Sequence, residues 1–276
     1  MKKLLAAILA LVMVLSLAAC GEDAETQTDT QDAGQTTEAQ EAEKVTFTVG
    51  FDAECPPFGF MDGEGGYTGF DLELAEAACA IYGWELVKTP IDWDAKDVEL
   101  NGGAIDCIWN GFTINGREND YEWSIPYCDN SQVIVAKASA GITTLADLAG
   151  KTVGVQAASA ALDVLQDPEG RKDIADTFAA LQEFPNYNNA FLDLEAGVID
   201  AVAMDIGVAN YQIATREGEY VIVEEALSSE QYGVGFKLGN TELRDKINDA
   251  LKQLTEDGTV AALAEKYEIT DMIILK

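Results

Sequence analysis

Strand-like and helix-like segments alternate through residues 45–270, and the alternation starts again near residue 140. The first series opens with a strand pattern at Val45–Gly50, where apolar and polar residues alternate. A helix pattern follows at Phe70–Tyr82 and stops at Gly83. Strands that alternate with helices are typical of α/β layers with a mixed but mostly parallel sheet. Because the pattern restarts, we expect two such lobes.

The remaining segments fit the same scheme. Further strand patterns lie at 84–88, 104–109, 132–137, 152–156 and 201–204, and further helix patterns at 94–100, 158–165, 191–196, 206–214, 241–255 and 259–267. If the last two helices return to the first lobe, two strands must cross between the lobes, near residues 132–138 and 230–237. We therefore expect lobe 1 at 45–133 and 235–276 and lobe 2 at 134–234. Ligands of open α/β sheets bind at the carboxyl ends of strands, so the cleft between the lobes is the expected site.

The beginning of the chain differs from this body. Lys2 and Lys3 precede an apolar run that ends at Ala19, which is the pattern of a secretory signal. The run is shorter than the about 20 apolar residues that a spanning helix needs. It leads into Leu17-Ala18-Ala19-Cys20-Gly21, which resembles the bacterial lipobox, where the cysteine thiol receives diacylglycerol and the signal is cut just before it. We expect a signal peptide at 1–19 and lipid on Cys20; an ordinary signal peptide with an incidental cysteine is the alternative.

A low-complexity segment follows the cysteine. Residues 21–43 are all Ala, Gly, Thr, Gln, Asp or Glu, and such a composition cannot form a core. We expect residues 20–44 to be a disordered acidic spacer behind a lipid anchor. The protein would then be held at the extracellular or periplasmic face of the cell membrane.

The net charge of the chain limits the classes of molecule that it can bind. The formal net charge is −32, and it becomes −34 if Lys2 and Lys3 leave with the signal peptide. Nucleic acid and anionic lipid repel a chain with this much negative charge. We therefore expect no nucleic-acid partner.

Four cysteines lie in the body: Cys55, Cys79, Cys107 and Cys128. Their even number in an exported chain permits disulfides, whereas the apolar neighbours of Cys79 and Cys107 favour buried free thiols. Their spacing matches no zinc pattern and the sequence has no His, so no metal site is expected.

Six motifs follow one another through the body. They are Gly50-Phe51-Asp52-Ala53-Glu54-Cys55-Pro56-Pro57-Phe58, Gly69-Phe70-Asp71-Leu72-Glu73-Leu74, the stretch 105–127 with Arg117, 145–156, 200–205, and Glu256-Asp257-Gly258-Thr259. Together they resemble the extracellular solute-binding proteins of ABC-type importers for polar amino acids. This resemblance implies a type II periplasmic-binding-protein fold, a free amino acid as ligand, an ABC permease as partner, a monomer, and neither catalysis nor a cofactor.

The resemblance also implies roles for individual residues. Arg117 matches the residue that binds the ligand carboxylate, a role that suits a planar guanidinium able to donate two parallel hydrogen bonds. Its spacing from Thr113 is one residue shorter than the family pattern, and a tight turn at Asn115-Gly116 would absorb the difference. Asp205 follows a strand and matches the residue that binds the ligand ammonium; capping of the next helix is the simpler reading.

Further polar groups match positions around the amino-acid backbone. Asn110, Gly111 and Thr113 offer backbone and side-chain hydrogen bonds from the first lobe. Gln156 and Ser159 would approach from the second lobe, and Ser159 would also suit the N-cap of the helix that follows.

The ligand side chain would meet Asp52, Cys55, Phe58 and Trp93. Trp93 matches a flanking aromatic position, whereas Cys55 stands where the family usually has a second aromatic ring. A carboxylate at Asp52 could select a cationic side chain, so a polar or basic amino acid is favoured.

Two other functions remain open. A sensor that reports its ligand to a membrane receptor would have the same body. A dehydratase on the same fold is the enzymatic alternative, but neither Asp52 nor Glu54 has a paired nucleophile, a His or a metal cluster beside it in the sequence pattern.

Overall fold

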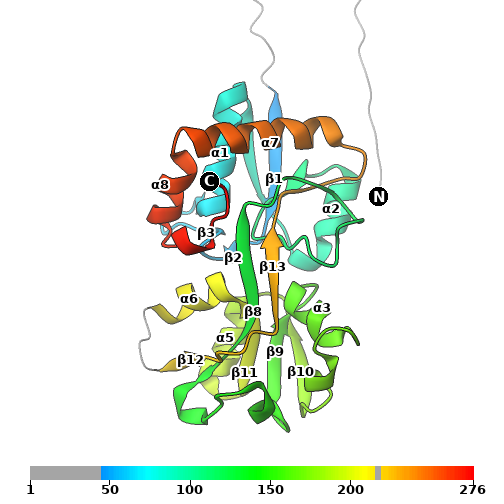
Figure 1. The fold of residues 1–276 in the computed structure, drawn as a ribbon, viewed down its shortest axis with the longest axis vertical. Helices are drawn as coiled ribbons and strands as arrows, with labels where there is room; N and C mark the ends of the chain where they lie inside the picture. The colour runs from blue at the N-terminus through cyan, green and yellow to red at the C-terminus, as the bar shows by residue number, and fades with distance from the viewer. Residues whose placement is uncertain (1–44, 215–218) are drawn as a thin grey trace, which may run out of the picture. The chain divides into compact units, whose positions relative to one another are not determined.

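The computed structural model describes residues 45–214 and 219–276, which form two α/β lobes joined by two long strands (Figure 1). The predicted signal peptide 1–19, the lipidation site Cys20 and the spacer 20–44 lie outside the described residues. None of the helices that the structure describes is long and apolar enough to cross a bilayer.

The first lobe is built on a five-stranded sheet of order β5-β1-β6-β14-β7. Its strands are β1 (Thr46–Phe51), β5 (Glu85–Pro90), β6 (Cys107–Ile108), β7 (Glu122–Trp123) and β14 (Gly235–Phe236). A small second sheet contains β2 (Glu54–Cys55), β3 (Gly59–Met61) and β4 (Tyr67–Thr68). The helices are α1 (Phe70–Tyr82), α2 (Lys96–Gly102), α7 (Thr241–Glu256) and α8 (Thr259–Lys266), with 3₁₀ turns η1 (Trp93–Ala95) and η4 (Thr270–Met272).

The second lobe is built on a six-stranded sheet of order β10-β9-β11-β8-β12, in which β13 also pairs with β8. Its strands are β8 (Cys128–Lys137), β9 (Thr152–Gln156), β10 (Ala180–Phe184), β11 (Ala201–Asp205), β12 (Tyr220–Ile222) and β13 (Ser228–Tyr232). The helices are α3 (Ala160–Gln166), α4 (Lys172–Ala175), α5 (Tyr187–Ala196) and α6 (Ile206–Ala214), with 3₁₀ turns η2 (Ala138–Ala140) and η3 (Leu145–Leu148).

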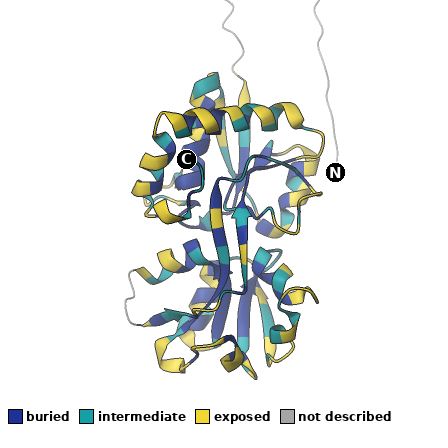
Figure 2. Ribbon diagram, viewed as in Figure 1, coloured by how far each residue is buried: buried dark blue, intermediate teal, exposed yellow. Residues whose placement is uncertain are grey.

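The C-terminal helices pack on the first lobe, as the sequence predicted. Both α7 and α8 contact α1 (Figure 1). In α7 the buried residues are Ile247, Ala250, Leu251 and Leu254, which lie on one face at helical spacing. The opposite face is solvated, so amphipathic periodicity alone predicted both the helix and its need for a partner (Figure 2).

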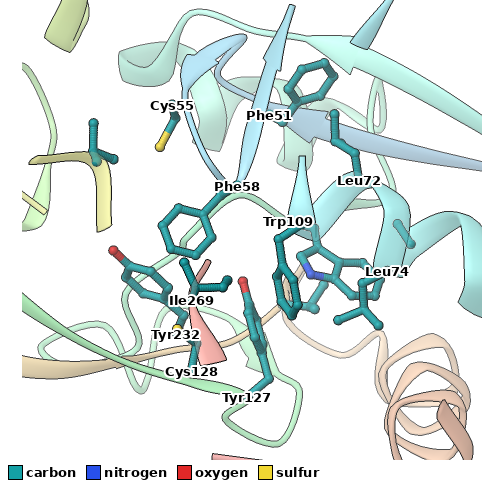
Figure 3. Packing of buried hydrophobic residues seen from close by; sticks show 14 of the residues in the cluster. Phe51, Cys55, Phe58, Leu72, Leu74, Trp109, Tyr127, Cys128, Tyr232 and Ile269 are labelled. Atoms are coloured by element: carbon teal, nitrogen blue, oxygen red, sulfur yellow. The ribbon is translucent and has the colours of Figure 1, made fainter. Parts of the chain in front are cut away.

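The two crossing strands are β8 and β13, and they pair antiparallel over five residues, from Cys128 opposite Tyr232 to Gln132 opposite Ser228. They lie near the predicted positions 132–138 and 230–237. Tyr127 and Tyr232 at the first-lobe end of this ribbon are fully buried, and Figure 3 shows both rings in the core beside Phe58.

The prediction of a mixed sheet in each lobe is confirmed. Parallel pairing joins β1 to β5 and β6, and β9 to β10 and β11, whereas β8 and β14 pair antiparallel with their neighbours. The reason is the chain path: a strand that crosses between lobes enters the second sheet from the opposite direction to the strands of its βαβ units.

The four body cysteines are free and buried in the structure, which the apolar neighbours of Cys79 and Cys107 had indicated for those two. Burial raises the pKa of each thiol above its ordinary value, so all four are poor nucleophiles.

Candidate ligand-binding site

A small cavity lies where strand ends of the two sheets meet. It is lined by Asp52, Cys55, Trp93, Asn110, Gly111, Thr113, Arg117, Gln156, Ser159, Ala160, Tyr187 and Asp205. The sequence analysis selected ten of these residues. Segments up to about 150 positions apart in the chain therefore meet at this cavity. The roles of these residues remain predictions.

The cavity follows from strand direction. Asp52 comes directly after β1, Gln156 is the last residue of β9, and Asp205 is the last residue of β11. Parallel strands bring their carboxyl ends to one edge of a sheet, and the two sheets face each other across those edges.

The Asp205 carboxylate accepts four hydrogen bonds from side chains. Tyr187 donates its hydroxyl to Oδ2 at 2.7 Å, and Tyr232 donates its hydroxyl to Oδ1 at 2.6 Å. Asn130 Nδ2 and Gln132 Nε2 also donate to Oδ1, at 2.8 and 2.7 Å. The side chain is therefore fixed in place by neutral donors, which leaves its negative charge available to a cation.

Glu230 on β13 is a second buried carboxylate, which sequence reasoning missed. Its Oε1 accepts hydrogen bonds of 2.8 Å from Thr113 Oγ1, Asn130 Nδ2 and Gln132 Nε2. Burial, followed by the nearby charge of Asp205, raises the pKa of Glu230 to about 7, although the three hydrogen bonds oppose that shift.

Asp52 links the lobes. Gln156 Nε2 donates to its Oδ2 at 2.7 Å, and the Glu54 amide donates to its Oδ1 at 2.8 Å. The Asn110 side-chain oxygen accepts a hydrogen bond from the Asp52 backbone N–H at 3.0 Å. The amide side chain that follows β6 therefore has a structural partner. Burial is the main cause that raises the pKa of Asp52.

Arg117 follows the predicted tight turn, in which its amide donates to the Ile114 carbonyl at 2.9 Å. Its guanidinium lines the cavity despite the short spacing from Thr113. Nη2 donates to Asp163 Oδ2 at 2.6 Å and to the Ala158 carbonyl at 3.4 Å, both in the second lobe. The Arg117 side chain is 12% exposed, whereas that of Asp163 is 60% exposed, so the charge of Asp163 is well screened.

Three predicted residues have other partners. The Thr113 hydroxyl donates to Glu230, and the Ser159 hydroxyl accepts the Leu162 amide at 3.2 Å as the N-cap of α3. The Gly111 amide donates to Asp71 Oδ2 at 2.6 Å, so only its carbonyl is free to face a ligand. Its φ of 54° lies in the left-handed region, which favours glycine.

The walls of the cavity include Trp93 and Cys55. The Trp93 ring is buried and packs edge-on against Phe112, with centroids 5.5 Å apart. Lys96 Nζ lies 5.3 Å from the Trp93 centroid and donates to the Ala158 carbonyl at 3.2 Å. Burial lowers the pKa of Lys96. The sequence pattern gave no sign of this lysine, because its place depends on contact between lobes.

Phe58 lies outside the cavity lining. It is fully buried and packs edge-on against Tyr232, with centroids 5.2 Å apart (Figure 3). The ring lies behind Gly111, which lines the cavity, so the structure places Phe58 next to the lining; its predicted contact with a ligand stays a prediction.

The buried polar residues that the sequence analysis did not select have one feature in common. Asn130, Gln132 and Glu230 are polar residues that alternate with more exposed residues along β8 and β13, and each is at least nine-tenths buried. Such residues usually belong to a satisfied polar network. Across the described residues, no group of three or more His, Cys, Asp or Glu side chains has an arrangement suited to a metal ion.

The fold and cavity together define the class of protein. Two α/β lobes that meet around a small polar cavity and are joined by crossing strands are the architecture of solute-binding proteins. The chain belongs to the bacterial extracellular solute-binding proteins, family 3, whose model matches residues 47–270.

Several relatives support this membership. The L-cystine-binding protein TcyJ of Escherichia coli (strain K12) is 31% identical over 228 residues, which are 82% of this chain and 83% of the relative. ABC transporter arginine-binding protein 1 of the same strain is 29% identical over 234 residues, covering 83% and 92%. An ABC uptake transporter substrate-binding protein from Streptococcus pneumoniae, solved with bound histidine, has a TM-score of 0.79 and 36% identity, covering 83% and 94%.

Proposed function

We propose that this protein binds a free polar or basic amino acid and delivers it to an ABC importer. The observation that carries the proposal is that the Arg117 guanidinium and the Asp205 carboxylate line the same cavity. A zwitterion presents one group of each charge, and such a buried pair of opposite sign matches both ends of it.

The pose follows from the contacts. Arg117 binds the ligand carboxylate through the guanidinium N–H groups that do not donate to Asp163. Asp205 accepts a hydrogen bond from the ammonium, with the Gly111 carbonyl as a second acceptor. Asp52, Cys55 and Trp93 then face the ligand side chain, and the buried carboxylate of Asp52 favours a side chain with a donor or a positive charge.

Closure around the ligand is supported by contacts between lobes. Gln156 bonds to Asp52, while Arg117 and Lys96 both donate to the Ala158 carbonyl. With β8 and β13 as the connection, we propose that the lobes 45–133 with 235–276 and 134–234 open and close by hinge motion.

A thermal-shift screen of the purified protein against the common amino acids and L-cystine tests the proposal. A tight ligand raises the unfolding temperature by mass action, and calorimetry then gives its affinity. We expect at least one strong binder, with Asp205→Asn and Arg117→Met each weakening it at least about 100-fold, because each leaves one charge of the ligand buried without a partner. Absence of binding by every compound would refute the proposal.

The anchor and the partners complete the proposal. Lipid on Cys20 would hold the protein at the outer face of the membrane as a monomer, at high effective concentration near its permease. A Cys20→Ala variant should be released from the membrane with its ligand affinity intact and with uptake lost. If deletion of the protein leaves uptake unchanged and abolishes a transcriptional response to the amino acid, it is a sensor instead.

A further inference from the structure

Asp205 and Glu230 are held by the same two amide groups. Strand β8 lies between β11 and β13, with Gln132 opposite Asp205 and Asn130 opposite Glu230. Because Asn130 and Gln132 are two positions apart, their side chains point to the same face of the sheet. The register therefore places both carboxylates on that face, one from each neighbouring strand.

Each amide bridges the two acids. Asn130 Nδ2 donates to Asp205 Oδ1 and to Glu230 Oε1, both at 2.8 Å. Gln132 Nε2 does the same at 2.7 and 2.8 Å. An amide nitrogen has two hydrogens, so these bonds use up both donors of each side chain.

Among the described residues, Asp205 and Glu230 have neutral donors but no ion-paired cation. Within the described part of the chain, neither carboxylate forms an ion pair with Lys or Arg. Asp205 is 9% exposed and Glu230 is 6% exposed. Two buried carboxylates that share only neutral donors repel one another, which favours one proton on the pair. The raised pKa of Glu230 has this cause in addition to burial.

The groups around Glu230 reinforce the effect. Those on the adjoining elements are Asp205 on β11, Tyr187 on α5, Tyr232 on β13, Cys128 and Asp129 on β8, and Asp163 and Asp167 beside the hollow described below. All of these are acids or neutral groups. One cation lies near them: Arg117 lines the ligand cavity with Asp205, but its ion pair is with Asp163 rather than with Asp205 or Glu230.

We propose that Asp205 and Glu230 share one proton in the empty cleft, and that the ammonium of the bound amino acid displaces it. The inference rests on the proposed function, because it requires an ammonium at Asp205. The step balances as a proton exchange: the ammonium keeps its three protons, the pair changes from one negative charge to two, and one proton passes to the solvent. The bound cation supplies the charge that the pair lacks.

Glu230 is thus a positioning residue, because it acts on the ligand through Asp205 and the shared amides. It is absent from the lining of the ligand cavity and instead borders a separate hollow with Asp163 and Ser228. That hollow gives a displaced proton a route to solvent that does not pass through the occupied site.

The consequence is pH-linked affinity. Below the pKa of the pair, binding must expel a proton, so affinity rises with pH by at most about tenfold per unit. Above that pKa, affinity becomes independent of pH. At pH 7 we expect a fraction of one proton released per ligand.

Calorimetry of the purified protein at pH 6, 7 and 8, in phosphate and in imidazole, measures the proton directly, because both buffers cover this range and differ in their heat of ionisation. The probes are L-arginine and L-glutamine, which do not titrate in this range. We expect release in the wild type and none in Glu230→Gln, which keeps the acceptor Oε1 but cannot ionise. Asp71→Asn is the matched control, since Asp71 is another buried acid with a raised pKa but shares no donor with Asp205; it should keep the release.

Two further measurements test whether Asp205 and Glu230 share a proton. Thr113→Val removes one donor to Glu230 and should move the release to higher pH. Infrared titration without ligand, carried out in the Asp71→Asn background because Asp71 also has a raised pKa, should show a carboxyl that ionises near neutral pH and is lost when Glu230→Gln is added. Binding without proton release in the wild type, or the same release in Glu230→Gln, overturns the inference. If neither probe binds, the proposed ligand class fails, and the infrared titration alone decides whether the pair holds a proton.

Discussion

Gln156 Nε2 donates a 2.7 Å hydrogen bond to Asp52 Oδ2, which joins the end of β9 in one lobe to the end of β1 in the other. Gln156 is 3% exposed and Asp52 is 7% exposed, so little water competes for the bond. A hydrogen bond to a buried carboxylate contributes more than one between neutral groups, about 1.5–3 kcal/mol. This contact can therefore influence whether the lobes stay together.

The first prediction concerns that bond. Gln156→Ala should shift the lobes toward an open arrangement and weaken amino-acid binding about tenfold, because closure loses one hydrogen bond to a charged group. Small-angle scattering should report a larger radius of gyration, and calorimetry should report the affinity. Gln253→Ala, on the exposed side of α7, is the control and should change neither. An unchanged radius together with unchanged affinity would contradict a role in closure.

The second prediction concerns Arg117 and Asp163. Arg117→Lys should weaken binding more than about tenfold, because an ammonium cannot donate two parallel hydrogen bonds to a carboxylate. Asp163→Asn should change affinity less than about threefold, since its side chain is mostly exposed and such pairs contribute about 0–1 kcal/mol. Calorimetry compares the two variants. Equal losses would mean that Asp163, rather than the ligand, is the main partner of Arg117.

The third prediction concerns Asp71, which is fully buried and accepts hydrogen bonds from the Gly111 amide and the Tyr127 hydroxyl. Burial raises the pKa of Asp71 to about 7 from 3.8. The folded state thus binds one more proton than the unfolded state between these values, so this group's contribution to stability falls as pH rises from about 4 to about 7. About three units at about 1.4 kcal/mol each give an effect of order 4 kcal/mol at most.

Urea unfolding of the wild type and Asp71→Asn from pH 4 to pH 8 measures this difference. The stability of the wild type relative to the variant should be greatest at low pH and level off above pH 7. Asp147→Asn provides a control of opposite sign, because hydrogen bonds from Thr143 and Thr144 lower the pKa of Asp147 to about 2. Its stabilising effect should be present above about pH 4 and be lost as pH falls toward 2. If the difference in unfolding free energy between the wild type and Asp71→Asn does not change with pH, Asp71 does not have the raised pKa on which this prediction depends.

The fourth prediction concerns Gly111. A Cβ at this position would lie 3.2 Å from Tyr232 Cε2 and 3.3 Å from Phe58 Cδ2, and φ is 54°. Gly111→Ala should therefore destabilise the fold by about 2–3 kcal/mol and distort the cavity wall. Gly116→Ala is the matched control, since its φ is 81° but no atom lies within 4 Å of the added Cβ. It should cost only the backbone strain, about 1 kcal/mol. Equal costs in thermal unfolding would show that packing at Gly111 is unimportant.

Local sequence patterns predicted most elements. The helix Phe70–Tyr82 begins and ends where the periodicity and Gly83 placed it, with Gly83 in the left-handed conformation that ends a helix. The strands β9 and β11 were also found within one residue. In contrast, β2, β3 and β4 were missed, because strands of two or three residues are too short to show a period. The strand β10 was missed because its residues Ala-Leu-Gln-Glu-Phe do not alternate between apolar and polar.

For the binding site, motifs in the sequence were enough to select ten of the residues that line the cavity. They sufficed because strand ends are local features and parallel strands share one edge. Phe58 was placed in the lining and lies behind it, since the direction of a loop side chain depends on what packs around it.

The sequence by itself determined the two-lobed α/β architecture, the crossing strands and the acids and arginine available to a ligand. Only the tertiary structure decided which of these groups bond to one another. Asn130 and Glu230 are separated by 100 positions and meet because an antiparallel register sets them opposite each other. Periodicity assigns a residue to a face, but register between distant strands is fixed by the packing of the whole sheet, and that register brings Glu230 and Asp205 to the same two amides.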